Sequence, residues 1–142
     1  MASPNSPSPS VSWQQRLPRI VALAGGVMFI ALGLWAMADP RGFFDALATF
    51  EPYNQHFIQD IGAFQLGLGA VLLLAGVTPR ADSLAVALLG VGAGAALHAL
   101  SHMLGHDLGG TPETDIPVFT ILAGLLLGAG VVRWRHARAV TR

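Results

Sequence analysis

Four long apolar runs constrain the fold of this chain more than any other feature of its sequence. They cover residues 20–38, 61–77, 84–104 and 116–132. Each is close to the roughly 20 residues that a helix needs to cross the hydrocarbon core of a bilayer. Because a backbone in lipid must satisfy its hydrogen bonds internally, continuous apolar runs of this length favour transmembrane helices. The sequence therefore predicts an all-α integral membrane protein, a bundle of four transmembrane helices.

The composition agrees with this class and excludes several others. Of the 142 residues, 53% are hydrophobic and 11% are charged, whereas a typical soluble domain has about a quarter charged. The net charge is zero, so we expect no nucleic acid among the partners. The chain has no cysteine, which excludes disulfides and thiolate metal sites. It also has no lysine, which excludes a Schiff-base lysine.

The chain divides into a membrane domain and two tails. Residues 1–15 are rich in proline and serine and are predicted to form a disordered cytoplasmic tail. Residues 16–135 make up the four-helix domain, and residues 136–142 form a basic cytoplasmic tail. The first apolar run is longer than the core of a signal peptide, and no clear cleavage site follows it, so we expect it to stay attached as a span.

The arginines predict the orientation. Seven of them flank the helices on the side of the two termini, and one lies in the other two loops. The positive-inside rule then places both termini in the cytoplasm of a multi-pass protein of the cell membrane.

The first outer loop has a helical pattern of its own. In the segment 39–52, phenylalanines and a leucine recur at the spacing of one helix face: Phe43, Phe44, Leu47 and Phe50. Asp39 and Pro40 are typical of a helix start, and Glu51 and Pro52 of its end. We expect a short amphipathic helix, which either lies on the membrane surface or caps the bundle.

Polar residues gather where the second and third apolar runs meet the outer side. His98 and His102 are four residues apart, which places them on one helix face, and His106 follows after Gly105. On the second run, His56 and Asp60 are also four apart. If the two helices are antiparallel neighbours, we expect these groups to meet in an outward-facing pocket, with Asp60 as the partner of the buried His98. The predicted site residues are His56, Asp60, His98 and His102, with His106 doubtful.

Four kinds of site fit this pattern. Imidazole and carboxylate groups from two helices offer three or four ligands for a divalent transition metal. A His–Asp pair also suits acid–base catalysis or proton relay, because imidazole titrates near neutral pH. Histidines from two helices can hold haem. The fourth possibility is that the cluster only forms hydrogen bonds between helices.

Glycine pairs recur inside the predicted spans. Gly90 and Gly94 are four apart on the third run, as are Gly124 and Gly128 on the fourth. Such spacings allow close backbone approach between helices, and Gly67 and Gly69 on the second run allow the same. We therefore expect these glycines to pack within the bundle.

The stretch DPRGFFDALATFEPYNQHFIQDIGAFQLGLG, followed by HALSHMLGHD, resembles a group of small four-helix actinobacterial membrane proteins of uncharacterised function. The group is similar in layout to the DoxX-like proteins, and the resemblance covers most of residues 39–107. The positions that match the pattern of the group are Asn54, His56, Asp60, Gly62, Ala63, His98 and His102. His106 departs from it by one position, and Leu97 stands where relatives often have proline. The resemblance implies the fold and a polar cluster, and some DoxX-like relatives are linked to quinone or sulfur redox chemistry.

Three functions are compatible with these features. The first is a membrane enzyme or redox accessory protein that uses the His/Asp pocket, with or without a metal. The second is a structural or accessory subunit of a membrane complex, in which the cluster holds helices together. The third is a small carrier, which would need a homo-oligomer because no span is polar along its whole length.

Overall fold

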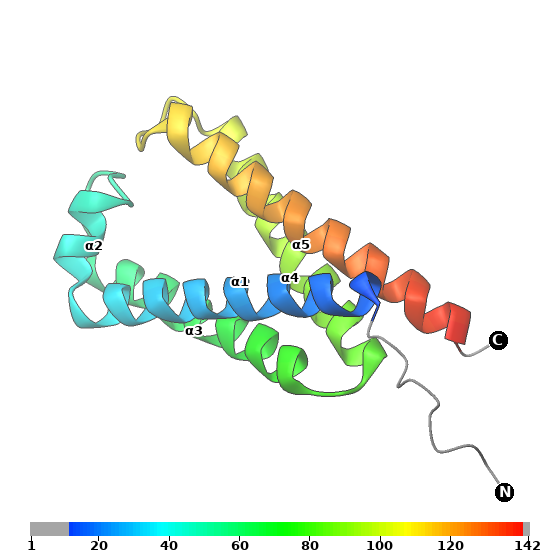
Figure 1. Ribbon diagram of the computed structural model, residues 1–142. Helices are drawn as coiled ribbons and strands as arrows, with labels where there is room; N and C mark the ends of the chain where they lie inside the picture. The colour runs from blue at the N-terminus through cyan, green and yellow to red at the C-terminus, as the bar shows by residue number, and fades with distance from the viewer. Residues whose placement is uncertain (1–11, 141–142) are drawn as a thin grey trace, which may run out of the picture.

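The computed structural model describes residues 12–140, and within this range the chain is all-helical. Figure 1 shows the arrangement of its five helices. Their bounds are α1 (Trp13–Ala38), α2 (Pro40–Ala46), α3 (Gln55–Val77), α4 (Ala81–Leu104) and α5 (Pro112–Val140). All helices except α2 are long and apolar enough to cross a membrane. The predicted fold class is therefore confirmed, and the chain is a multi-pass membrane protein with a bilayer as its environment.

The helix ends follow from local chemistry. α1, α3 and α4 end at residues 38, 77 and 104, as the apolar runs predict. All of the long helices begin earlier than predicted, because helical structure continues into the more polar residues that precede each apolar run. At the start of α3, for example, Asn54 Oδ1 accepts a hydrogen bond from the Phe57 amide at 3.1 Å.

The predicted tails are partly helical. α1 begins at Trp13, so residues 13–15 belong to a helix and not to a disordered tail, while residues 1–11 lie outside the described range. α5 continues to Val140, so most of the predicted basic tail extends the last helix.

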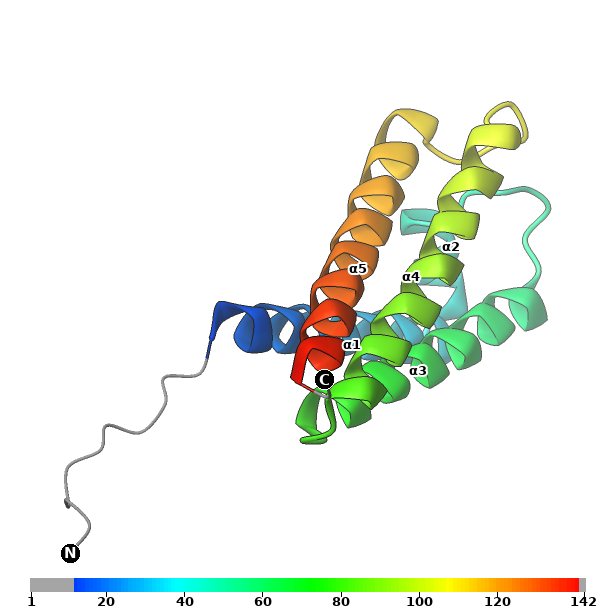
Figure 2. The same cartoon turned by 90° about the vertical axis from the view of Figure 1, so that its right-hand side faces the viewer.

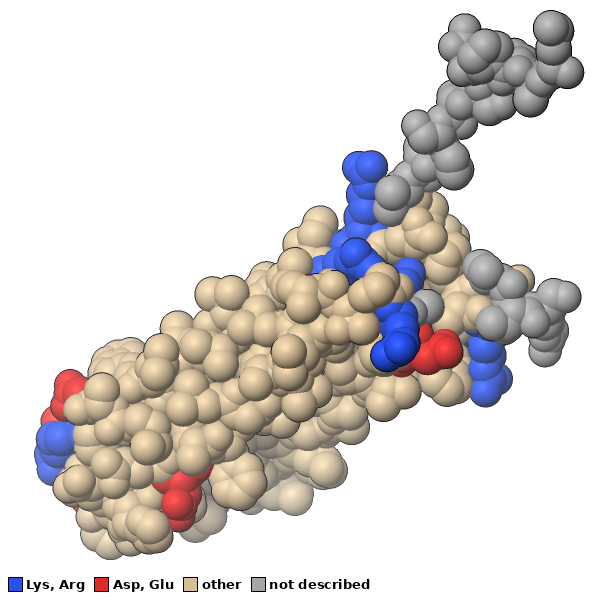
Figure 3. All heavy atoms as spheres, turned by 90° about the horizontal axis from the view of Figure 1, so that it is seen from below, with Lys and Arg blue, Asp and Glu red and all other residues tan. Residues whose placement is uncertain are grey.

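The four long helices form two hairpins. α1 packs along α3, and α4 packs along α5, whereas α3 and α4 touch much less. Figures 1 and 2 show that the hairpins meet at the end that carries both chain ends and separate toward the other end. We call the first the arginine-rich end and the second the loop end. Arg41 is at the loop end, and the other described arginines are at the arginine-rich end. On the face drawn in Figure 3, charged side chains gather at the two ends and the middle is uncharged.

Two buried clusters show where the hairpins share a core. The larger contains residues of all four long helices, including Phe29, Leu72, Leu88 and Leu126. The smaller lies at the loop end and is built from α1, α2 and α3 alone. The halves of α4 and α5 near the loop end contribute no residue to it, so the shared core of the hairpins lies mainly toward the arginine-rich end.

Glycines set the close contact within each hairpin. A Cβ at Gly33 of α1 would lie 2.8 Å from the carbonyl oxygen of Gly62 on α3. Likewise, a Cβ at Gly92 of α4 would lie 3.0 Å from the backbone nitrogen of Leu127 on α5. Side chains at these positions would therefore push the helices apart.

Gly69 of the second run packs as predicted, because a Cβ on it would lie 2.9 Å from the carbonyl oxygen of Gly26 on α1. The glycine pairs predicted on the third and fourth runs do not pack, and for them the prediction is wrong. A Cβ added at any of them would have no neighbour within 4 Å; they are Gly90, Gly94, Gly124 and Gly128. They face open space on the outside of the hairpins, because the helix faces in contact are offset from them by two residues.

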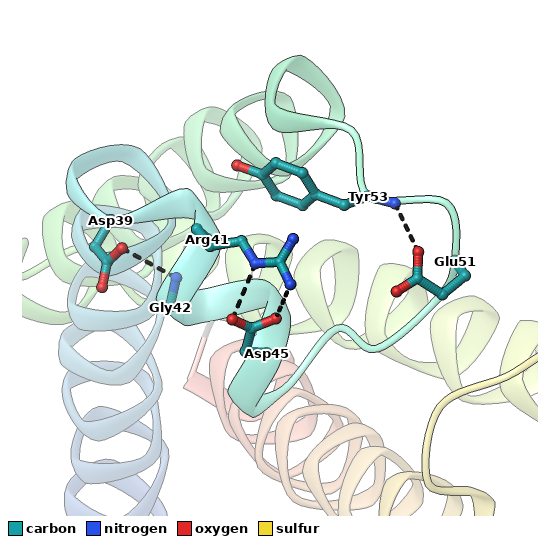
Figure 4. Close-up of polar contacts among 6 residues, drawn as sticks. All are labelled: Asp39, Arg41, Gly42, Asp45, Glu51 and Tyr53. Atoms are coloured by element: carbon teal, nitrogen blue, oxygen red, sulfur yellow. Dashed lines mark hydrogen bonds and ion pairs between the residues drawn. The ribbon is translucent and has the colours of Figure 1, made fainter.

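The short helix α2 caps the α1–α3 hairpin at the loop end (Figure 4). Asp39 starts it by accepting a hydrogen bond from the Gly42 amide at 3.0 Å, as the sequence predicts. The helix ends at Ala46, earlier than predicted, so Leu47 and Phe50 do not continue its apolar face. Phe43 is buried in the smaller core, which favours the capping role over a purely surface one.

Arg41 makes the polar contacts on the exposed side of α2. Its guanidinium pairs with Asp45 at 2.9 Å and lies over the ring of Tyr53 at 5.0 Å (Figure 4). The hydrogen bond to Asp45, together with the charge of that carboxylate, raises the pKa of Arg41.

Candidate functional site

Two imidazoles of α4 and a phenylalanine of α5 form the centre of the candidate site. His98 and His102 are one helical turn apart, and their ring centroids are separated by 4.8 Å. The ring of Phe119 lies 4.4 Å from that of His98 and 4.7 Å from that of His102. These distances are typical of packed aromatic rings. The close packing of α4 on α5 therefore brings the predicted histidine face against the last helix.

The carboxylate beside His102 is Asp115. His102 Nδ1 lies 3.7 Å from Asp115 Oδ2, and the two side chains are only 12% and 14% exposed. Asp115 is fixed by the start of α5, because its two oxygens accept hydrogen bonds at 3.0 Å from the amide and the hydroxyl of Thr111. An acidic residue in the first helical turn is also stabilised by the helix dipole. At this distance the two groups are neighbours but do not form a hydrogen bond.

Phe50 connects this cluster to the other hairpin. It lies in the link between α2 and α3, and its ring centroid is 5.6 Å from that of His102. The loop before α5 accommodates the same ring, because a Cβ at Gly110 would lie 2.9 Å from Phe50 Cζ. Gly110 has φ +78°, a conformation that favours glycine. The α2–α3 link thus packs on the α4–α5 loop and covers one side of the His102 ring.

The two predicted residues of α3 lie elsewhere. His56 Nε2 is 3.6 Å from Asp60 Oδ2, but both groups belong to the same helix and their side chains are 86% and 54% exposed. The sequence expectation that Asp60 is the carboxylate partner in the α4 cluster does not match the structure, which has Asp115 in that role. The reason is that α4 pairs closely with α5 and only loosely with α3.

His106 is not part of the cluster. α4 ends at Leu104, and His106 is exposed in the loop that follows. His98 is also exposed, although its ring packs on Phe119. The cluster therefore offers one accessible imidazole, His98, and one largely covered imidazole, His102.

The donor geometry does not fit the expected metal site. Among residues 12–140, no group of three or more histidines and carboxylates is placed to hold a metal ion. Divalent metals in catalytic sites usually take three protein ligands. The arrangement is better suited to moving a proton, since imidazole can exchange one near neutral pH and a nearby carboxylate stabilises its charged form.

Sequence reasoning missed three members of the cluster. Asp115 and Phe119 lie in the first turns of α5, and the sequence places Phe50 on a short amphipathic helix that lies on the membrane surface or caps the bundle. The segment 111–115 carries a usable signal, because a threonine followed by acidic residues is typical of a helix start. That signal locates the carboxylate along the chain but does not say which helix faces it.

The fold and the site together define a four-helix membrane protein of two hairpins, with a His–Asp pair at the loop end of the second. No protein-family model, curated protein sequence or solved structure matches the chain.

Proposed function

We propose that this protein is a membrane enzyme or redox accessory protein that carries out acid–base chemistry at the loop end of the α4–α5 hairpin. The observation that carries the proposal is the His102–Asp115 pair, a largely covered imidazole and carboxylate in contact across two helices. Placing ionisable groups at the edge of a span has a free-energy cost, and such groups often mark a functional site.

Each residue of the cluster has a separate role in this acid–base chemistry. His98 is exposed and accepts a proton from an O–H or acidic C–H group of the substrate. The adjacent His102 ring orients His98, while Asp115 stabilises positive charge on the imidazole pair. Phe119 packs on both rings and excludes water from their far side.

The substrate class follows from the surroundings. Large apolar side chains are exposed near the exposed imidazole on α4, including Leu97 and Leu104. In a bilayer these side chains contact lipid, so a substrate that reaches His98 from this side is small and lipid-soluble.

The orientation we propose places the arginine-rich end and both termini in the cytoplasm of a cell membrane. The site then faces the outside. Because the chain has no cysteine, single cysteines report each side separately. A membrane-impermeant maleimide added to intact cells should label Thr49→Cys at the loop end and leave Arg135→Cys unlabelled until the cells are opened. The reverse pattern would invert the topology.

Comparative mass spectrometry tests the activity. The purified protein, reconstituted in liposomes, is incubated with a membrane lipid extract of its source cells, beside His98→Gln and Asp115→Asn variants of equal expression and fold. The expected result is at least one extract component that the parent converts and both variants leave unchanged. If parent and variants give identical profiles, the acid–base proposal is wrong.

Elemental analysis of the same samples tests the metal hypothesis directly. From the donor geometry we expect no stoichiometric transition metal in protein purified without chelator or histidine tag. Near-stoichiometric metal that is lost in a His98→Ala/His102→Ala variant would restore a metal-dependent mechanism.

A second function is favoured by the contacts of Phe50. Because this ring joins the two hairpins at His102, the cluster is also suited to fixing their separation in an accessory subunit of a membrane complex. In that case the same variants lower the unfolding temperature, and a partner protein or a second copy of the chain co-purifies with the parent but not with them.

A further inference from the structure

The seam of α3 and α4, two consecutive helices that touch much less than the helices of each hairpin, contains a groove at the arginine-rich end. Its volume is about 680 Å³, within the range of roughly 300–1,000 Å³ that ligand sites occupy. Apolar side chains of α3 (Val71, Leu74, Ala75) and α4 (Val86, Ala87) line its length. Both helices are candidate spans, so this lining lies at the depth of the hydrocarbon core and suits an apolar chain.

Small residues follow the lining of the groove toward the loop end. Gly90 follows Ala87 by three positions on α4, and Gly67 precedes Val71 by four on α3, so each lies on the groove face of its helix. A Cβ at either glycine would have no neighbour within 4 Å. The open glycine positions, which do not pack inside the bundle, therefore extend the space available to a long, thin occupant.

The mouth of the groove is polar and mainly positive. Thr78, Arg80, Asp82 and Ser83 line it, where the short turn between α3 and α4 closes the seam. Arg19 of α1 reaches the same rim, because its Nη2 donates a hydrogen bond to the Thr78 carbonyl at 3.4 Å. Two guanidinium groups thus stand beside the one carboxylate.

Arg133 of α5 adds to this charge from behind the rim. It is 5% exposed, and its Nε and Nη1 atoms are buried without a hydrogen-bond partner. The charges that act on it are those of Arg19 and Asp82. Three guanidinium groups around one carboxylate leave a positive surplus, and that surplus is complementary to an anion.

We propose that this groove is a binding site for one anionic phospholipid. One acyl chain lies between α3 and α4 along Ala87 and Gly90, and the phosphate lies at the rim beside Arg80 and Arg19. The occupant must be apolar over the depth of a span and negatively charged at one end, which is the chemistry of an anionic phospholipid of the arginine-rich side. The site is separate from the His–Asp cluster and does not depend on its function.

Native mass spectrometry of the full chain tests this proposal. The protein is equilibrated in mixed micelles with equal amounts of dioleoyl phosphatidylglycerol and dioleoyl phosphatidylcholine, which differ in headgroup charge but not in acyl chains. We expect one retained phosphatidylglycerol per chain. Equal retention of the two lipids would overturn the proposal, because it would show apolar contact without headgroup recognition.

Two matched pairs of variants locate the site. Arg80→Gln should weaken phosphatidylglycerol retention by about fivefold, the effect of one basic residue near a membrane surface. Its control, Arg135→Gln of α5, should leave the retention unchanged. Gly90→Leu should fill the groove and abolish retention, whereas Gly124→Leu, at an equally open glycine of α5, should not. Arg80 is exposed, so its variant stays informative even if Gly90→Leu fails to fold. Unchanged retention in Arg80→Gln would place the lipid elsewhere.

Discussion

The molecule contains two His–Asp pairs of the same composition in opposite surroundings. His56 and Asp60 are one turn apart on α3 and are largely exposed, whereas His102 and Asp115 come from two helices and are largely covered. The first pair needs nothing but helical spacing. The second needs the α4–α5 hairpin, the cap at Thr111 and the rings around it. Proximity in sequence therefore produces a pair, but only tertiary packing gives it low exposure.

The largest effect should come from the ring that both imidazoles of the second pair share. Phe119→Ala removes the contacts with His98 and His102 and should lower the free energy of unfolding by about 2 kcal/mol, less than for a fully buried phenylalanine. Phe64→Ala is the control, because Phe64 is 77% exposed on α3; its effect should stay within about 0.5 kcal/mol. Unfolding in detergent micelles, followed by circular dichroism, measures both. Equal effects would mean that the covered cluster is no better packed than the lipid-facing surface.

Removing the carboxylate of each pair should have the second-largest difference in effect on the free energy of unfolding. Asp115→Ala removes the acceptor of two Thr111 hydrogen bonds and the partner of His102, at a cost of about 1–2 kcal/mol, as for loss of a helix cap. Asp60→Ala should cost at most about 0.5 kcal/mol, since exposed pairs contribute little. The same unfolding assay compares them. A larger cost for Asp60 would assign it a buried partner.

The difference between the pairs also shows which features of the fold and of the candidate site can be predicted from the sequence. The apolar runs predict four spans and the ends of three helices, because hydropathy and capping are local properties. The i, i+4 spacing correctly places His98 and His102 on one face. The spacing does not predict which helix contacts that face, because α3 and α5 are both apolar and each is joined to α4 by a short connection. The glycines that decide the pairing, such as Gly92, look no different in sequence from the open ones, such as Gly90.

The bridge between the hairpins should have a smaller effect than either change at the cluster. Phe50→Ala removes the ring that contacts His102, at a cost of about 1 kcal/mol. A double-mutant cycle with His102→Ala isolates this contact, and we expect a coupling energy of at least about 0.5 kcal/mol. Phe57→Ala is the control, because its side chain is 59% exposed at the start of α3. Additive effects of Phe50→Ala and His102→Ala would show that the link does not hold the hairpins together.

The smallest effect should come from the exposed imidazole on α3. His56→Ala should change the free energy of unfolding by less than about 0.5 kcal/mol, because an i, i+4 pair on a helix surface contributes about that much at most. A loss above about 1 kcal/mol would mean that another chain covers His56 in the membrane. The exposed pair of α3 would then be part of an interface between chains, whereas the pair of α4 and α5 is covered within the single chain.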